Sequence, residues 1–415
     1  MVDISGLPAR RAAMRMLDAV LRRGETLDLA ERAATKGIHS FADRALARAI
    51  ASEVLRWLVD LDALIDSATQ RNLPEDAKPR TALRIMLAQW LRLDTPPHAV
   101  IATGLPLLTG GPRRLAHGVF STLVKRGSSL PDTPTLPEGV AERWGERSAA
   151  IAAGLAIPPP LDLSLRDADQ TDQWTRELGG TSLAPGHVRL PRGVPIDQLP
   201  GFAEGAWWVQ DLAASLPVRL LGPGKGADGA AKRVLDLCAA PGGKSLQLAA
   251  AGWSLTALDS SEKRLEMLRR NLQRTGLTAE IITGNAMAWE PAKQFDAILL
   301  DAPCTATGTC RRHPDVIHRI GKRQIAELAE LQAGLLARAA DWLPTGGRLV
   351  YAVCSLEEAE GEAQARRVEL TGDPITAAEL PAGVVPTAEG WLRTDPGMMA
   401  DAGGMDGFFI ARWQR

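Results

Sequence analysis

Two cysteines, 50 residues apart in the sequence, each follow an apolar run of the kind that forms a buried strand. Cys304 ends the segment 300–304 (LDAPC), and Cys354 ends the segment 351–354 (YAVC). If both strands belong to one parallel sheet, their carboxyl ends bring the two thiols to the same edge. Two thiols at a ligand-binding edge predict covalent chemistry.

A glycine turn between a strand and a helix opens the same region. Residues 234–245 read VLDLCAAPGGKS, which suits a nucleotide-like ligand. A Walker A loop needs glycine six residues before Lys244, where Cys238 stands, and the G-x-G-x-x-G pattern is absent. What remains is the turn and Asp259, 17 residues beyond Gly242 at the end of the next strand. A carboxylate so placed can accept both ribose hydroxyls.

Two further polar residues follow strands of this region. Asn285 follows the third strand, where it can hydrogen-bond an adenine edge, and Asp301 ends the fourth. A ligand with a ribose and a base but no need for phosphate binding fits S-adenosylmethionine. Asp259 or Asn285 taken alone can equally well cap a helix, but the glycine turn favours ligand binding for both.

Methyl transfer to C5 of a pyrimidine explains why two thiols would stand beside this cofactor. C5 becomes nucleophilic only after a thiolate adds to C6, and the reaction then needs support for charge at N3 and a base. Cys354, Asp301 and Cys304 are available for these roles. The spacing alone leaves the two cysteines interchangeable. Cys238 and Cys310 are instead interpreted as small buried hydrophobes.

A basic run, Arg311-Arg312-His313, follows Cys304. Such a run can bind a phosphate and lower the pKa of a nearby thiol, or it can be an ordinary solvated loop.

Strands alternate with helices from residue 233 onward. The expected strands are 233–238, 254–258, 279–283, 295–300, 347–353 and 408–413, and a long helix covers 323–342. This alternation predicts a doubly wound, mostly parallel Rossmann-like sheet that binds ligands beyond the carboxyl ends of its strands.

The preceding part of the chain has a different pattern. From residue 8 to 126, apolar residues recur at helical spacing between turn signals, which predicts an all-α bundle of five or six short helices. A linker rich in Ser and Pro covers 128–137. The segment 138–222 predicts a small α+β subdomain. The expected domains are therefore 1–130, 138–222 and 223–415.

Composition limits the class of protein. The chain of 415 residues is 45% hydrophobic and 23% charged, which is typical of a globular protein of two or three domains. We expect a cytoplasmic protein without a membrane contact, because no leader pattern and no apolar run of roughly 18 residues is present. The cysteines lack metal-ligand spacing, so no metal site is expected. Residues 1–127 hold 19 Lys and Arg against 13 Asp and Glu, which favours phosphate binding or reflects a solvated surface.

These motifs together resemble the RNA cytosine-5 methyltransferases of the Sun/Fmu (RsmB) family. The similar segments of the catalytic region are 236–245, 301–304 with Gly308 and 312–314, and 354–356. The segments 43–44, 56–57, 95–100 and 117–120 resemble the family's NusB-like RNA-binding domain. Residues 358–361 read EAEG where the family commonly has Pro-Glu-Glu-Asn, and Asn285 stands where Asp is frequent.

The resemblance implies roles for individual residues. Cys354 would be the nucleophile, Cys304 would assist product release, and Asp301 would complete the catalytic group. S-adenosylmethionine would be bound by Cys238, Ala239, Ala240, Pro241, Gly242, Gly243, Lys244, Asp259, Arg264, Asn285 and Asp301.

The expected function is therefore an S-adenosylmethionine-dependent RNA (cytosine-5)-methyltransferase that acts as a monomer on 16S rRNA. A tRNA cytosine-5 methyltransferase is the first alternative, because the catalytic residues do not exclude it. A non-catalytic RNA-binding protein is the second, but it would require loss of Cys354 or of the glycine turn, and both are present.

Overall fold

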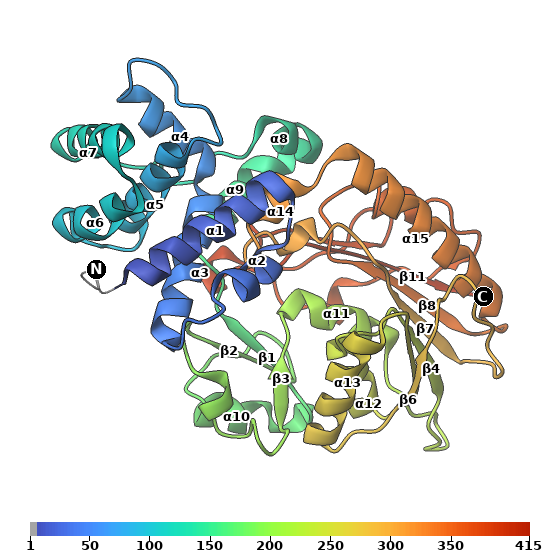
Figure 1. Ribbon diagram of the computed structural model, residues 1–415. Coiled ribbons are helices and arrows are strands. Elements are labelled where there is room, and N and C mark those ends of the chain that lie inside the picture. Colours follow the sequence, from blue (N-terminus) through green and yellow to red (C-terminus); the bar gives the residue numbers. More distant parts are fainter. Residues whose placement is uncertain (1–5) are drawn as a thin grey trace. The chain divides into compact units, whose positions relative to one another are not determined.

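The computed structural model describes residues 6–415, which form two compact units. The first unit contains residues up to 157 together with 310–320, and the second contains 158–309 and 321–415. Figure 1 shows the N-terminal helices of the first unit, up to residue 125, in blue to cyan, and the main sheet of the second in yellow to red. The expected classes, an all-α bundle and a Rossmann-like α/β domain, are both confirmed.

The first unit begins with seven α-helices where five or six were expected. Two of them are separated at Trp57, whose backbone (φ −110°, ψ 20°) leaves the helical region without any Gly or Pro to signal the break. The helices pack around a core formed largely by the buried faces of the first, third and fifth. Their bounds are α1 Leu7–Arg23, α2 Leu27–Ala34, α3 Phe41–Arg56, α4 Leu58–Ser67, α5 Lys78–Arg92, α6 Pro97–Gly104 and α7 Gly110–Lys125.

A segment distant in sequence completes this unit. Residues 310–320, with the short helix α14 (Val316–Arg319), pack against α1 to α3. The His318 ring lies 2.6 Å from the carbonyl oxygen of Leu55, and Asp315 accepts a hydrogen bond from the amide of Leu27 at 3.3 Å. These two hydrogen bonds join the segment to α2 and α3.

The segment 138–222 is divided between the two units. Helices α8 (Glu138–Trp144) and α9 (Ser148–Leu155) belong to the first, and the remainder belongs to the second. In the second unit, β1 (Leu161–Leu165) pairs antiparallel with β2 (His187–Leu190) and β3 (Trp207–Val209). Helices α10 (Thr171–Glu177) and α11 (Leu212–Leu221) follow β1 and β3, and α11 packs on the main sheet.

The main sheet of the second unit has the strand order β10-β11-β8-β7-β4-β5-β6, with β9 pairing β11. The six expected strands are all present within two residues of the expected bounds, and β9 and β10 are additional. Strands β4 to β8 are parallel, and β11 is antiparallel to β8. The bounds are β4 Arg233–Leu237, β5 Ser254–Asp259, β6 Glu280–Thr283, β7 Ala297–Asp301, β8 Arg348–Val353, β9 Thr371–Gly372, β10 Leu392–Thr394 and β11 Phe408–Gln414.

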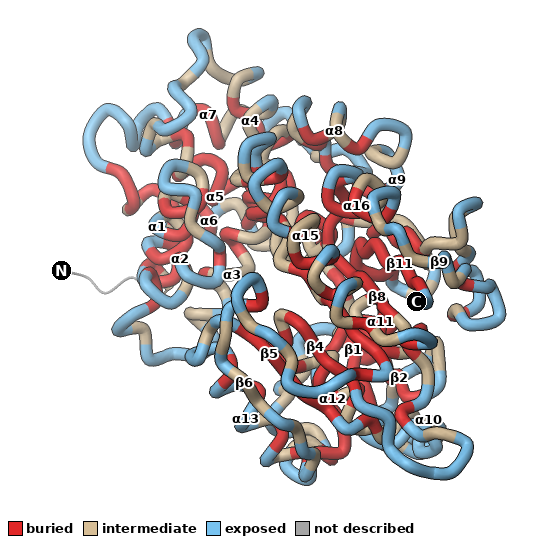
Figure 2. The backbone as a smooth tube through the Cα atoms, turned by 90° about the vertical axis from the view of Figure 1, so that its right-hand side faces the viewer, coloured by how far each residue is buried: buried red, intermediate tan, exposed pale blue. Residues whose placement is uncertain are grey.

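Helices cover both faces of this sheet. Val234, Leu299 and Val350 pack on the α11 side, while their neighbours along each strand pack against α15 (Lys322–Trp342) on the other side. The strands are consequently buried, as the red course of β4, β5 and β8 in Figure 2 shows. Helices α12 (Gly243–Ala250), α13 (Glu262–Thr275) and α16 (Glu362–Ala365) complete the layers. No helix within residues 6–415 has both the length and the apolar character needed to cross a membrane.

Candidate active site

The carboxyl ends of β4, β7 and β8 meet at one edge of the sheet, as the sequence predicted. Leu237 pairs with Leu300, and Asp301 pairs with Ala352, so the residues that follow these strands are neighbours. The chain leaves β4 toward β5 on one side and places β7 on the other, which makes this edge the switch point of a doubly wound sheet. Ligands of such folds bind at this point.

The two cysteines of the sequence prediction meet at this edge. Their Sγ atoms are 3.4 Å apart, and both residues are partly buried. The hydrogen bond to Cys354 raises the pKa of Cys304 well above its ordinary value, and burial and the charges of Cys354 and Glu360 raise it further. The expectation that the basic run 311–313 lowers a nearby thiol pKa is therefore wrong for Cys304.

Asp301 stands beside the thiols in an ion pair with Lys244. The Nζ to Oδ2 distance is 2.8 Å, and Nζ also lies 5.1 Å from the centre of the Phe408 ring. Burial lowers the pKa of Lys244, but Asp301 and, after it, Cys354 outweigh this effect, so the pKa is raised. The arrangement keeps a positive charge next to the carboxylate and the nucleophile candidate.

The glycine turn lies against the buried carboxylate of Asp259. This side chain, 4% exposed, accepts hydrogen bonds from the amides of Ala240 at 3.1 Å and Ser261 at 2.8 Å. Gly242 has a φ of 109°, and a Cβ there would lie 2.5 Å from a methyl group of Leu268, so only glycine fits. Asp259 thus holds the turn in place while its remaining acceptor capacity suits ribose hydroxyls.

Arg264 also lies at this turn. Its guanidinium donates to the carbonyl oxygen of Ala240 and is 3.7 Å from Asp259. A small apolar cluster that includes Ala239 and Ala240 supports the turn from below. The turn, the carboxylate and Asp301 form a donor and acceptor set that fits a nucleoside ligand with a positive sulfonium.

Asn285 follows β6, as predicted, but its side chain already has a local partner. The residue is exposed, and its Oδ1 accepts a hydrogen bond from the amide of Met287 at 3.0 Å. The turn-capping interpretation therefore applies to its oxygen, while its amide nitrogen remains the group that could meet a base.

Burial limits the chemistry open to the other two cysteines and to Trp207 and Trp208. Cys238 is in the left-handed region (φ 64°), and burial, with the charges of Asp301 and Asp259, raises its pKa to about 12. Cys310 is buried in the first unit. Trp207 and Trp208 are also buried, which excludes them as exposed stacking platforms.

Two buried acids near the thiols were not singled out in the sequence. Burial raises the pKa of Asp236, on β4, to about 7, against the opposing hydrogen bond from Ser245. Glu360 is fully buried behind the two cysteine loops. In the sequence it appears within a run of glutamates that reads as a solvated loop, and only its place six residues after Cys354 hints at a role.

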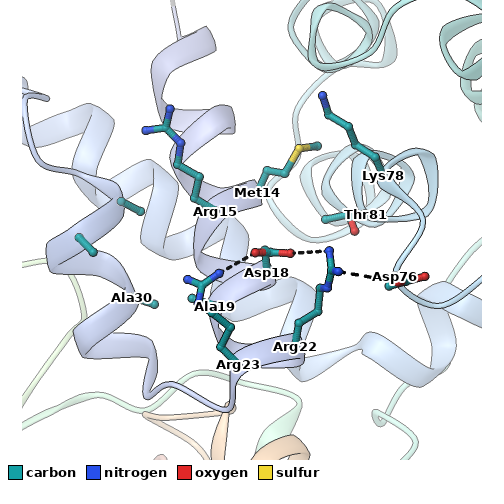
Figure 3. Close-up of a pocket in the computed structure, with 12 residues that line it drawn as sticks. Met14, Arg15, Asp18, Ala19, Arg22, Arg23, Ala30, Asp76, Lys78 and Thr81 are labelled. Atoms are coloured by element: carbon teal, nitrogen blue, oxygen red, sulfur yellow. Dashed lines mark hydrogen bonds and ion pairs between the residues drawn. The ribbon is translucent and has the colours of Figure 1, made fainter.

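A cavity of about 450 Å³ lies in the first unit, among α1, α2 and the N-terminal part of α5. Its walls are apolar, formed by Met14 and several alanines, and its rim carries four cations. Figure 3 shows Asp18 bound to two of them, with Arg15 and Lys78 on opposite sides. The lining residues are Met14, Arg15, Asp18, Ala19, Arg22, Arg23, Ala30, Ala33, Ala34, Asp76, Lys78 and Thr81.

The fold and the site together define the class: an S-adenosylmethionine-dependent methyltransferase with a helical N-terminal unit. Residues 227–414 match the family model described as 16S rRNA methyltransferase RsmB/F, and residues 7–107 match the NusB family. The chain is 34% identical to ribosomal RNA small subunit methyltransferase B of Klebsiella pneumoniae over 97% of both chains. It is 35% identical to the Xylella fastidiosa protein of the same name over 98% of both. The chain belongs to the RsmB family, which confirms the resemblance seen in the sequence.

Solved structures share the fold. The crystal structure of PH0851 matches with a TM-score of 0.72 at 22% identity, covering 100% of both chains. NSun6 from Pyrococcus horikoshii, solved with SFG, matches with a TM-score of 0.57 at 18% identity, covering 67% of this chain and 98% of that one.

Proposed function

We propose that this protein methylates C5 of a cytosine in 16S rRNA through a covalent bond between Cys354 and C6. The observation that carries the proposal is the pair of Sγ atoms 3.4 Å apart at the switch point, beside the Asp301–Lys244 ion pair. A cysteine that only fills space in the core needs no second thiol beside it. Two thiols in contact at the ligand edge suit a reaction in which one sulfur bonds to the substrate and must later leave it.

The chemistry assigns one role to each side chain. The Cys354 thiolate forms a bond to C6, and the C5=C6 electron pair moves to C5. C5 then bonds to the methyl group that S-adenosylmethionine would supply when bound, while the methyl–sulfur bond breaks and its electron pair stays on that sulfur, which becomes a neutral thioether. The Asp301–Lys244 pair supports the negative charge that develops toward N3, because Asp301 holds the positive Lys244 ammonium in place. Loss of the C5 proton to water re-forms the C5=C6 bond, and the C6–Sγ pair returns to Cys354.

Cys304 fits the last of these steps better than it fits a base. Its raised pKa keeps it a thiol, and a thiol at 3.4 Å can donate a hydrogen bond to the Cys354 sulfur as that sulfur takes up negative charge. A base would have to be a thiolate. The geometry therefore favours the release role, which the spacing in the sequence left open.

The helical unit is proposed to bind the RNA through phosphates. Residues 1–127 carry an excess of six positive charges, from 19 Lys and Arg against 13 Asp and Glu. Four of these Lys and Arg residues line the cavity of Figure 3 together with Asp18 and Asp76, and neither Arg15 nor Lys78 is in an ion pair among the described residues. Unpaired exposed cations suit contacts to phosphate oxygens without dependence on base sequence. We further propose that the protein acts as a monomer in the cytoplasm, without a metal.

Bisulfite sequencing tests the substrate. Purified protein and S-adenosylmethionine are incubated with unmodified 16S rRNA or with unmodified tRNA, and each RNA is then sequenced. We expect one cytosine of 16S rRNA to resist conversion and none in tRNA. Resistance only in tRNA would establish the tRNA alternative, and no resistance in either, with naked RNA and with small subunits, would contradict cytosine-5 methylation.

A further inference from the structure

Glu360 links the two loops that carry the reactive thiols. It is 0% exposed, and its carboxylate accepts hydrogen bonds from the amide of Thr305 at 2.9 Å and from the Thr305 hydroxyl. It also accepts from the Ser355 hydroxyl at 2.5 Å. Thr305 directly follows Cys304, and Ser355 directly follows Cys354, so one carboxylate holds the residue next to each sulfur.

The carboxylate is itself fixed from two other directions. Gln332, on α15, donates through Nε2 to Glu360 at 3.0 Å and to the carbonyl oxygen of Pro303 at 2.8 Å. The Tyr351 hydroxyl donates to the main-chain oxygen of Glu360 at 2.5 Å. Four donors therefore converge on two carboxylate oxygens that are screened from water, and such a network holds its members in one geometry.

Other hydrogen bonds also link the two loops directly, among them one between the hydroxyls of Thr307 and Ser355 at 3.3 Å. The amide of Gly308 donates to the carbonyl oxygen of Cys354 at 3.0 Å, and the hydroxyl of Thr307 accepts from the amide of Leu356 at 3.0 Å. These bonds join the loops downstream of Cys304. At the residues adjoining the sulfurs, the Thr305 and Ser355 hydroxyls lie 3.4 Å apart, and the carboxylate of Glu360 accepts a hydrogen bond from both of them.

We propose that Glu360 is a positioning residue for the release step, setting the Cys304 sulfur against the Cys354 sulfur so that Cys354 can leave the methylated base. The proposal rests on the proposed function, in which Cys354 attacks and Cys304 assists its departure. Reactive groups must be held to within a fraction of an ångström, and a displacement of about 1 Å can cost about 100-fold in rate.

The charge of Glu360 acts in the same direction as its geometry. It contributes to the raised pKa of Cys304, after the larger effects of the Cys354 hydrogen bond and burial. A negative charge behind Cys304 disfavours its thiolate. Cys304 is thus kept as a donor toward the sulfur that accumulates charge.

The test compares Glu360→Gln with Glu358→Gln in the full-length protein. Gln has the same shape but neither the charge nor the capacity to accept from all four donors. Glu358 is two residues away, exposed, and paired only with exposed Arg366 in this structure, which makes its variant the matched control. Methylation of 16S rRNA is measured beside the denaturant-resistant protein–RNA adduct.

We expect Glu360→Gln to lower the methylation rate by about 10- to 100-fold and to accumulate an adduct on ordinary cytosine, with S-adenosylmethionine affinity within about twofold of the wild type. Glu358→Gln should match the wild type in all three measurements. A merely structural role would lower attack and release together and give no adduct. Slow methylation without an adduct, or unchanged methylation, overturns the proposal.

Two further variants keep the test decisive. Thr305→Val removes the hydroxyl that donates to Glu360 and that also lies 3.4 Å from the Ser355 hydroxyl. It should accumulate the same adduct even if Glu360→Gln fails to fold. Cys304→Ala is measured in parallel. An adduct with Cys304→Ala but with neither Glu360→Gln nor Thr305→Val overturns the role of Glu360 alone. No adduct in any variant overturns the assignment of the thiols and this proposal with it.

Discussion

The strand edge of the second unit and the cavity of the first unit hold their polar groups in opposite ways. At the strand edge, Asp259 and Glu360 are buried and have several fixed partners each. Around the cavity, Arg22 and Arg23 are more than half exposed and share Asp18. Buried networks define a geometry, whereas exposed ion pairs contribute little and exchange partners easily. One region is therefore suited to chemistry on a defined ligand, and the other to a flexible polyanion.

The largest effect is expected at the strand edge, where substitutions can distinguish the role of Cys354 from that of Cys304. Cys354→Ala should abolish methylation and also the trapping of RNA that contains 5-fluorocytidine, whose fluorine cannot leave as a proton. Cys304→Ala should still attack, and should accumulate an adduct on ordinary cytosine, seen as a denaturant-resistant band shift. If Cys304→Ala gives no adduct while Cys354→Ala does, the two roles are reversed.

Removing the carboxylate of Asp259 should have the next largest effect. Asp259→Ala deletes a charged hydrogen-bond acceptor and is expected to weaken S-adenosylmethionine binding by about 1.5 to 3 kcal/mol, measured by titration calorimetry. Asp259→Asn keeps one acceptor oxygen and should lose less. Because Asp259 also holds the amides of Ala240 and Ser261, thermal melting of both variants is the control for folding. Unchanged affinity in a folded Asp259→Ala protein would remove this residue from the site.

The raised pKa of Asp236, at the same edge, predicts how the free energy of unfolding depends on pH. Its pKa is about 7 in the folded protein against 3.8 for the free group, so the folded state keeps a proton that the unfolded state loses. Its contribution to stability is thus complete below about pH 4 and is lost as the pH rises to about 7. Relative to wild type, the unfolding free energy of Asp236→Asn should rise by roughly 2 to 3 kcal/mol from pH 5 to pH 8 in urea titrations.

Asp162 supplies the control for that measurement. Burial alone would raise its pKa, but Arg189 and His187 outweigh burial and lower it far below neutrality. It therefore stays ionised from pH 5 to 8. Asp162→Asn should show a constant difference from wild type over this range, and an equal pH dependence in both variants would exclude Asp236 as the titrating group.

The smallest expected effect lies at the cavity. Replacing both Arg15 and Lys78 by Gln should weaken RNA binding only several-fold, by less than about 1.4 kcal/mol, and should reduce the slope of log affinity against log salt by about 2. Turnover at saturating RNA should not change. Arg323→Gln, on α15 and 92% exposed, is the control for loss of a surface charge. An unchanged salt slope in the double variant would place the phosphate contacts elsewhere.

The sequence predicted what depends on local patterns. Strand alternation and the residues directly after each strand placed Cys304, Cys354, Asp301 and Asp259 correctly, because parallel strands align their carboxyl ends whatever the details of packing. Glu360 escaped prediction because its partners Thr305 and Gln332 lie 55 and 28 residues away. Burial of such a residue follows from tertiary packing that no local pattern records.

Other features could not be predicted from local sequence patterns for similar reasons. The break at Trp57 carries no Gly or Pro, so α3 and α4 read as one periodic segment. The side-chain oxygen of Asn285 accepts a hydrogen bond from the amide of Met287. The sequence allowed either such a local partner or a ligand base, and only the folded backbone decides between them. The division of residues 138–222 between two units likewise follows from packing, since α11 uses its apolar face to cover the main sheet.

Residues 310–320 belong to the first unit, although the residues on both sides of them belong to the second, and this limits how the gene can be truncated or recombined. The chain passes from one unit to the other three times, at 157–158, 309–310 and 320–321. A gene fragment that stops at residue 157 encodes a bundle without the segment that binds Leu27 and Leu55. A single recombination event at any one of these points would transfer only part of a unit. We therefore expect the two units of this enzyme to be exchanged together.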